Sequence, residues 1–177
     1  MKKYKIPSIM LIMTFVIALT VCGTVFAYMF KQTDYEDNQF TPAVVSCRVE
    51  ETFDGTKKTS IKVENTGNID AYLRVRLVSY WVDTNGNVVA KPSSIPEINL
   101  EDGWIKGPNN TYYYQSSVAP NNLTGELLSS SISLEKDANG YLQVVEVFAE
   151  AIQSNPKDAV TSSWDVLLDQ NGYIVSP

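Results

Sequence analysis

The chain has 177 residues, of which 44% are hydrophobic and 19% charged, a composition typical of a globular protein with one domain and a buried core. Its 14 basic and 20 acidic residues give a net charge of −6, and a surface of that sign repels phosphate backbones, which disfavours nucleic-acid binding. There is no histidine, so His-dependent catalytic triads and H-E-x-x-H zinc sites are excluded.

The N-terminus has the pattern of an export signal. A short stretch with three lysines precedes a run without charged residues (residues 6–30), and about 20 apolar residues can span a bilayer. An acceptable small-x-small motif ends at Ala27, which predicts a signal peptide over residues 1–27, cut between Ala27 and Tyr28. The alternative is an uncleaved anchor, with membrane contact only through this segment. Cleavage would remove the three lysines and leave 11 basic against 20 acidic residues, a net charge of −9. We expect a secreted, cell-surface or matrix location.

The two cysteines predict no disulfide within the mature chain. Cys22 lies in the signal, so Cys47 is the only cysteine that remains after cleavage. An exported protein without disulfides fits a bacterial envelope. Cys47 stands in an alternating run beside Val45 and Val49, so we interpret it as a small buried apolar residue, with a reactive thiol or an intermolecular bridge as the alternatives.

The mature chain begins with a polar, acidic leader and continues as a series of strands. Residues 28–40 have little to bury and are expected to be mobile. Pro42 suits the start of a strand or a sheet edge. Period-2 patterns and the turn residues between them predict one domain over residues 41–177. Its expected strands are residues 41–53, 60–64, 71–83, 88–90, 104–106, 111–115, 130–135, 141–151 and 173–175.

The segment from residue 71 to residue 83 has the longest alternation in the chain. Apolar Leu73, Val75 and Leu77 fall on one face, and Arg74 and Arg76 fall on the other. This pattern predicts the central strand of an antiparallel β-sandwich. A single short helix is expected near the C-terminus, over residues 155–167.

Two further patterns have both a functional and a structural interpretation. The sequence Asp-x-Asn-Gly occurs at Asp83, Asp137 and Asp169, and it suits calcium loops less well than tight turns, because the spacing differs from an EF-hand. The aromatic residues could form a platform for a glycan, although aromatic side chains in strands more often lie in the core. They are Tyr80, Trp81, Trp104, Tyr112, Tyr113 and Tyr114.

Two segments resemble a known bacterial family. The sequence GTVFAYMF (residues 23–30) resembles signal peptides cut by the SipW-type signal peptidase. The sequence VENTGNIDAYLRV (residues 63–75) resembles a block of the TasA/camelysin family, and the similarity continues at DGWIKG (residues 102–107) and toward Trp164. The resemblance implies a jelly-roll-like β-sandwich at a Gram-positive cell surface or in a biofilm matrix, in a family whose members assemble into fibres and sometimes carry a metallopeptidase label.

The leading functional hypothesis is a structural surface or matrix protein, a fibre-forming or accessory subunit. An N-terminal strand could leave its own sheet and complete a sheet edge of the next subunit, or of a related matrix subunit. The candidate donor residues are Thr41, Val45, Cys47 and Val49. The alternative, that this segment pairs within its own subunit, stays open.

Two other functions are weighed against it. One is a monomeric binding sandwich displayed at the surface, with a glycan or protein ligand. The other is a camelysin-like metalloendopeptidase, which without histidine and with one mature cysteine would have to hold its metal with carboxylates alone. The sequence predicts no catalytic residue, no metal ligand and no cofactor, and the SipW-type signal peptidase is the partner expected during export.

Overall fold

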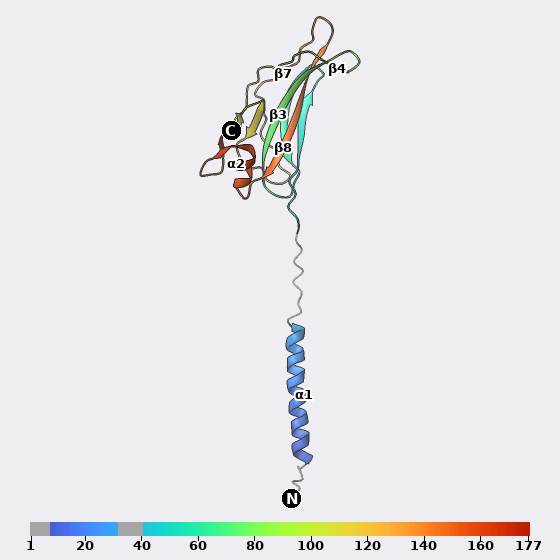
Figure 1. Cartoon of the computed structure of the whole chain (residues 1–177), viewed down its shortest axis with the longest axis vertical. Helices are drawn as coiled ribbons and strands as arrows, with labels where there is room; N and C mark the ends of the chain where they lie inside the picture. The colour runs from blue at the N-terminus through green and yellow to red at the C-terminus, as the bar shows by residue number, and fades with distance from the viewer. Residues whose placement is uncertain (1–7, 32–40) are drawn as a thin grey trace. The chain divides into compact units, whose positions relative to one another are not determined.

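The computed structural model describes residues 8–31 and 41–177, and the chain divides into two compact units, Met1–Thr41 and Pro42–Pro177. The first unit contains helix α1 (Ser8–Lys31), and the second contains all the strands together with helix α2 (Asp158–Trp164) (Figure 1).

Helix α1 is continuous through Gly23 and is long and apolar enough, over Ser8–Tyr28, to cross a membrane. The hydroxyls of its threonines are hydrogen-bonded within the helix. Each donates to a backbone carbonyl three or four residues earlier, as Thr14 does to Met10 at 2.6 Å. Such a helix is compatible with a signal sequence or a membrane anchor, because both need an apolar helix of this length. Residues 28–31 of the expected leader continue the helix, and residues 32–40 lie outside the described residues.

The second unit is built from antiparallel sheets, as the alternation predicted. One sheet has the order β1-β2-β7. In the other, β3 is the central strand: it pairs along its whole length with β8 on one edge and with β6 and β4 on the other, and β5 lies beyond β6. Strands β9 and β10 form a separate two-stranded antiparallel sheet. The bounds are β1 Cys47–Phe53, β2 Lys57–Asn65, β3 Ala71–Val82, β4 Val88–Val89, β5 Trp104–Lys106, β6 Thr111–Tyr114, β7 Ile132–Ser133, β8 Leu142–Gln153, β9 Leu167–Leu168 and β10 Ile174–Ser176.

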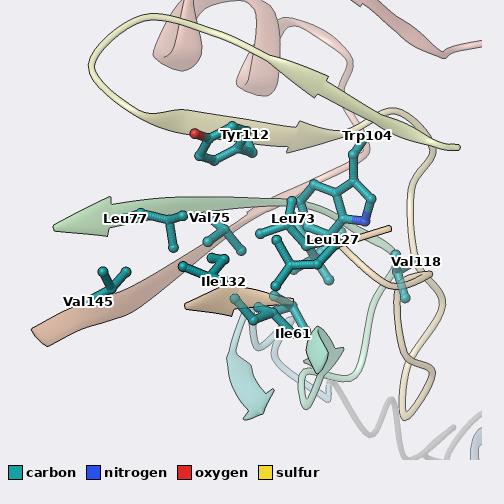
Figure 2. Close-up of a cluster of buried hydrophobic side chains, with 13 residues drawn as sticks. Ile61, Leu73, Val75, Leu77, Trp104, Tyr112, Val118, Leu127, Ile132 and Val145 are labelled. Atoms are coloured by element: carbon teal, nitrogen blue, oxygen red, sulfur yellow. The ribbon is translucent and has the colours of Figure 1, made fainter. Parts of the chain in front are cut away.

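The main core lies between the two larger sheets. Figure 2 shows Leu73, Val75 and Leu77 of β3 facing Ile61 of β2 and Ile132 of β7, and all five are at most 2% exposed. The predicted apolar face of the long strand is therefore confirmed, and burying these side chains contributes roughly 1.5–3 kcal/mol each.

A second, smaller core covers the opposite face of β3 near its start. There Tyr72 and Tyr113 pack against Val160 and Trp164 of α2 and against Ile174 of β10. This explains why Tyr72 is buried although it lies on the face of Arg74. The helix is shorter than the expected residues 155–167: it spans Asp158–Trp164, and its C-cap Asp165 has a left-handed φ of 53°. The following residues form β9.

The first strand also begins later than predicted. Residues 41–46 form no regular strand, and β1 starts at Cys47. Pro42 lacks a backbone N–H, and the loop of residues 66–68 replaces a strand as the neighbour of this segment.

Candidate functional site: the open edges of β1 and β8

The candidate metal loops are tight turns. In all three, Oδ1 of the first aspartate accepts hydrogen bonds from the backbone N–H groups two and four residues later, at 2.8–2.9 Å. Oδ2 of Asp137 accepts from Lys91 Nζ at 2.7 Å, so that a protein cation already holds this oxygen. Among residues 8–31 and 41–177, no group of three or more His, Cys, Asp and Glu side chains could hold a metal.

The aromatic residues do not form an exposed platform. Trp81, Trp104, Tyr112 and Tyr113 are each at most 5% exposed. Trp104 stacks at a tilt on Tyr114, with ring centroids 5.2 Å apart. Trp104 and Tyr112 belong to the main core, against which Tyr114 packs, and Tyr113 belongs to the second core, so the interpretation as core is confirmed for these four. Trp81 is buried outside both clusters, and Tyr80 is half-buried with its hydroxyl donating to Glu146 Oε1 at 2.6 Å. The six aromatics therefore form no shared exposed platform.

The candidate donor segment lies against its own subunit. The N–H of Val44 donates to Asn68 Oδ1 at 2.7 Å, and the carbonyl of Val44 accepts from the Asn68 N–H at 3.0 Å. Within β1, Cys47 lies opposite Asn65 and Val49 lies opposite Val63. The last two positions of the segment thus occupy an edge of the β1-β2-β7 sheet.

The four proposed donor residues differ in their burial. Thr41 and Val45 are exposed, whereas Cys47 and Val49 are half-buried and pack against the main core. Burial and, to a lesser degree, the charge of Glu150 raise the pKa of the Cys47 thiol. The thiol is therefore protonated at neutral pH, in keeping with its interpretation as a small apolar residue.

Strand β8 leaves its outer edge open over much of its length. On the neighbouring strand β3, the N–H of Leu77 donates to the Asn110 carbonyl at 3.0 Å, on the side of β3 away from β8. Leu77 is opposite Val147, so this bond shows which residues of the β3–β8 pair are hydrogen-bonded to each other and which are not. By that alternation Phe148 faces β3 with its N–H and carbonyl, while Val147 and Ala149 direct theirs away from β3. In the described part of the chain, no strand other than β3 pairs with β8.

A groove, here called the seam, separates the open edges of β1 and β8. It has a volume of about 530 Å³ and is lined by Val49, Glu51, Phe53 and Lys58 on one side and by residues 144–148 on the other. Phe53 is 47% exposed there. An exposed apolar ring beside unpaired backbone is the environment in which another strand can be added.

The only fully sequestered charge of the seam sits at its β1 end, within the described residues. Lys58 is 5% exposed, its Nζ lies 2.7 Å from Glu51 Oε2, and it stands 5.1 Å from the centre of the Phe53 ring. The ion pair joins the last part of β1 to β2. The register of the two strands shifts between Thr52 and Phe53, directly after Glu51 and Thr52.

The predicted signal-peptidase site belongs to the other unit. Ala27 and Tyr28 lie in α1, and Tyr28 is 67% exposed. The β8 wall of the seam was not singled out from the sequence. Alternation over residues 141–151 identified a strand there, but nothing in it indicates which edge stays unpaired.

No known protein family, no curated protein and no solved structure matches the chain.

Proposed function

We propose that this chain is an exported, non-enzymatic structural protein of the cell surface or matrix, and that it assembles by exchanging its N-terminal strand between copies. The observation that carries the proposal is the position of β1. It lies at a sheet edge, β2 is the one described strand that pairs with it, and the open seam lies on its other side. The domain in this proposal is a jelly-roll-like sandwich of the TasA/camelysin kind.

Exchange is feasible because it replaces each contact by an identical one. If residues 41–49 detach, residues 47–49 uncover the β2 edge at Val63 and Asn65, and the same residues of a second copy fit it in the same register. The contacts of Val44 with Asn68 are also restored between copies. Swapped elements of this kind cost little at equilibrium. Repeated in one direction, the contact gives an open fibre, since each copy donates one strand and accepts one.

The donor segment follows the apolar helix in the sequence, and this order connects assembly with export. A strand that is still joined to an uncleaved anchor stays at the membrane, whereas cleavage after Ala27 by a SipW-type signal peptidase frees the chain that begins at Tyr28. The proposal therefore makes release from the N-terminal segment a condition for fibres that leave the membrane.

The decisive experiment locks β1 to β2 within one subunit. Arg48 and Glu64 are directly opposite in the register and lie on the outer face of the sheet. Cα atoms of such antiparallel partners are about 5.5 Å apart, within the range of a disulfide. The variant Arg48→Cys/Glu64→Cys, with Cys47→Ser to prevent mispairing, is prepared as Tyr28–Pro177. Light scattering and negative-stain electron microscopy follow its assembly.

The oxidised variant is expected to stay monomeric, and the same protein after reduction is expected to form filaments like the parent. The reduced sample is the matched control, because it carries the same three substitutions. Filaments formed equally by the locked protein would rule out strand exchange, and a parent chain that stays monomeric at high concentration would rule out self-assembly as a property of this protein.

A further inference from the structure

The edge of β3 opposite β8 has a gap that holds a polar groove. Strand β6 pairs with this edge only at residues 74–76, and β4 pairs only at residues 81–82, so the stretch between them has no strand neighbour there. A groove of about 560 Å³ occupies the gap. This β3 groove is lined by residues 76–79, by the loop of residues 93–95 and by the turn residues Asn109 and Asn110.

A free guanidinium lies at the groove. Of the three arginines of the chain, Arg48 pairs with Glu64 at 2.5 Å and Arg74 pairs with Glu150 at 2.6 Å. Arg76 is exposed and makes no ion pair or hydrogen bond with any described residue, and no carboxylate lines the groove. A planar guanidinium without a partner suits a carboxylate or phosphate oxygen pair, which it can bind through two parallel hydrogen bonds.

The walls add hydrogen-bonding groups that are not otherwise used. The side chains of Ser94, Asn109 and Asn110 have no hydrogen-bond partner within the described ranges, and the two asparagines have left-handed φ angles of 54° and 55° in a turn closed by Thr111 N–H to Pro108 O at 3.1 Å. Asn tolerates this conformation better than most residues. Hydroxyl and carboxamide groups both donate and accept, so they suit the hydroxyls of a ligand.

A buried glutamine holds the serine wall in place. Gln143 is 5% exposed, and its Nε2 donates to Ser94 O at 2.8 Å and to Ser79 Oγ at 3.2 Å. The hydroxyls of Ser79 and Ser93 are 2.6 Å apart, and Gln143 Oε1 accepts from the Glu135 N–H at 3.2 Å, which orients the carboxamide. The loop is thus attached to the sheet before any ligand arrives, which lowers the entropy lost on binding.

We propose that the β3 groove binds an oxyanion, a carboxylate or phosphate, that is carried on a hydroxyl-rich ligand such as an acidic polysaccharide. Arg76 would bind the anionic group, and Ser94 with the two asparagines would bind neighbouring hydroxyls. No aromatic residue lines the groove, so the ligand meets no ring to stack on, and charge carries the recognition. The volume is that of a small-ligand site. This inference does not depend on strand exchange, because the groove lies on the other edge of β3 from β8.

Titration calorimetry tests this on Tyr28–Pro177, at concentrations where light scattering shows monomers. The probes are trigalacturonate for the carboxylate, a glycerol phosphate oligomer for the phosphate, and maltotriose as the uncharged control. Saturable binding of one charged probe, weakened by added salt, is the expected result. The probe that binds identifies the source of the oxyanion.

Two variants make the assignment specific. Arg76→Gln is expected to weaken the charged probe by about tenfold or more, since it removes a charge-assisted hydrogen-bond pair. Lys106→Gln removes the same charge from an exposed position outside the groove and is expected to leave the affinity within about twofold. Unchanged thermal melting shows that both variants fold. Equal losses in the two variants, equal binding of maltotriose, or no saturable binding would overturn the proposal.

Discussion

At the scale of single residues, one buried carboxamide organises the turn between β2 and β3. Asn65 is fully buried, and its Nδ2 donates to the carbonyls of Ile69 at 2.8 Å and Val118 at 2.7 Å, while its Oδ1 accepts from the Gly67 N–H at 3.0 Å. Gly67 does not have a positive φ, so the need for glycine at this position has another cause. Glycine is needed because a Cβ there would lie 2.3 Å from the Val44 carbonyl oxygen.

Asn65→Asp is expected to lower the free energy of unfolding by about 3 kcal/mol or more, because a carboxylate would face two carbonyl oxygens that have lost their donor. Urea denaturation followed by tryptophan fluorescence measures the loss. Asn122→Asp makes the same chemical change at an exposed position and should cost less than about 1 kcal/mol. Similar losses in both variants would contradict the role assigned to the buried carboxamide.

The aspartates of the turns predict how stability depends on pH. Hydrogen bonds from the Asn87 side chain and backbone hold the pKa of Asp83 below its usual range, and the ammonium of Lys91 does the same for Asp137. A carboxyl whose pKa is lower in the folded state stabilises that state above its unfolded pKa of about 4, and this stabilisation is lost as the pH falls through the folded value. We therefore expect the free energy of unfolding to be level near neutral pH and to fall below about pH 4. Asp137→Asn should flatten this acid limb in urea titrations at several pH values; an unchanged limb would contradict the assignment.

At the scale of elements, the position of a strand in its sheet decides which backbone groups are free. Phe148 and Ala149 are neighbours in β8, yet the alternation of the β3 pairing directs the N–H of Phe148 to β3 and that of Ala149 to the outer edge of β8. Arg74, which stands 4.6 Å from the Trp164 ring and pairs with Glu150, shows the same dependence: its strand position places it under α2. Its neighbour Arg76, on the same face, stays without a partner among the described residues.

This alternation predicts different effects of proline at two adjacent positions. Phe148→Pro removes a ladder hydrogen bond and should cost about 3 kcal/mol or more, whereas Ala149→Pro removes an unpaired donor and should cost much less. Phe148→Ala serves as the control for the loss of the exposed ring. Thermal melting and urea denaturation of the three variants measure the difference, and equal losses in the two proline variants would mean that the seam edge of β8 is not free.

At the scale of the whole molecule, the half-buried thiol of Cys47 reports whether β1 leaves its sheet. Its pKa is raised and the residue is half-buried against the main core, so we expect a thiol reagent to react with it mainly when β1 opens. In Tyr28–Pro177 the labelling rate of Cys47 should therefore reach a plateau as the reagent concentration rises, at the opening rate of the strand. Stopped-flow or manual labelling with Ellman's reagent measures this rate.

The control for this prediction moves the thiol along the same strand. The variant Cys47→Ser/Thr52→Cys carries its thiol at an exposed position, where the labelling rate should increase linearly with reagent concentration. A linear dependence for Cys47 itself, at the rate of the exposed thiol, would show that β1 does not protect it and would weaken the case for a strand that opens as a unit.

The amino-acid sequence by itself determined the strands, their faces and most of the turns. Alternation places Leu73, Val75 and Leu77 on the buried face whichever strands pair with β3, because side chains of a strand alternate with a period of two. The Asp-x-Asn-Gly turns are equally local, since their hydrogen bonds join residues at most four apart. The long apolar helix α1 is likewise a consequence of composition alone.

The tertiary structure decided which edges stay open and which arginine lacks a partner among the described residues. It also decided that residues 42–46 lie against the loop of residues 66–68 and that residues 47–49 pair with their own β2. These properties depend on contacts between residues far apart in the sequence, such as Arg74 with Glu150 and Gln143 with Ser94. The period-2 pattern specifies on which face of the sheet a side chain lies. Which residue contacts it there depends on how the two sheets pack around their common core. For that reason the strands could be predicted from the sequence, whereas the seam and the β3 groove could be identified only from the folded chain.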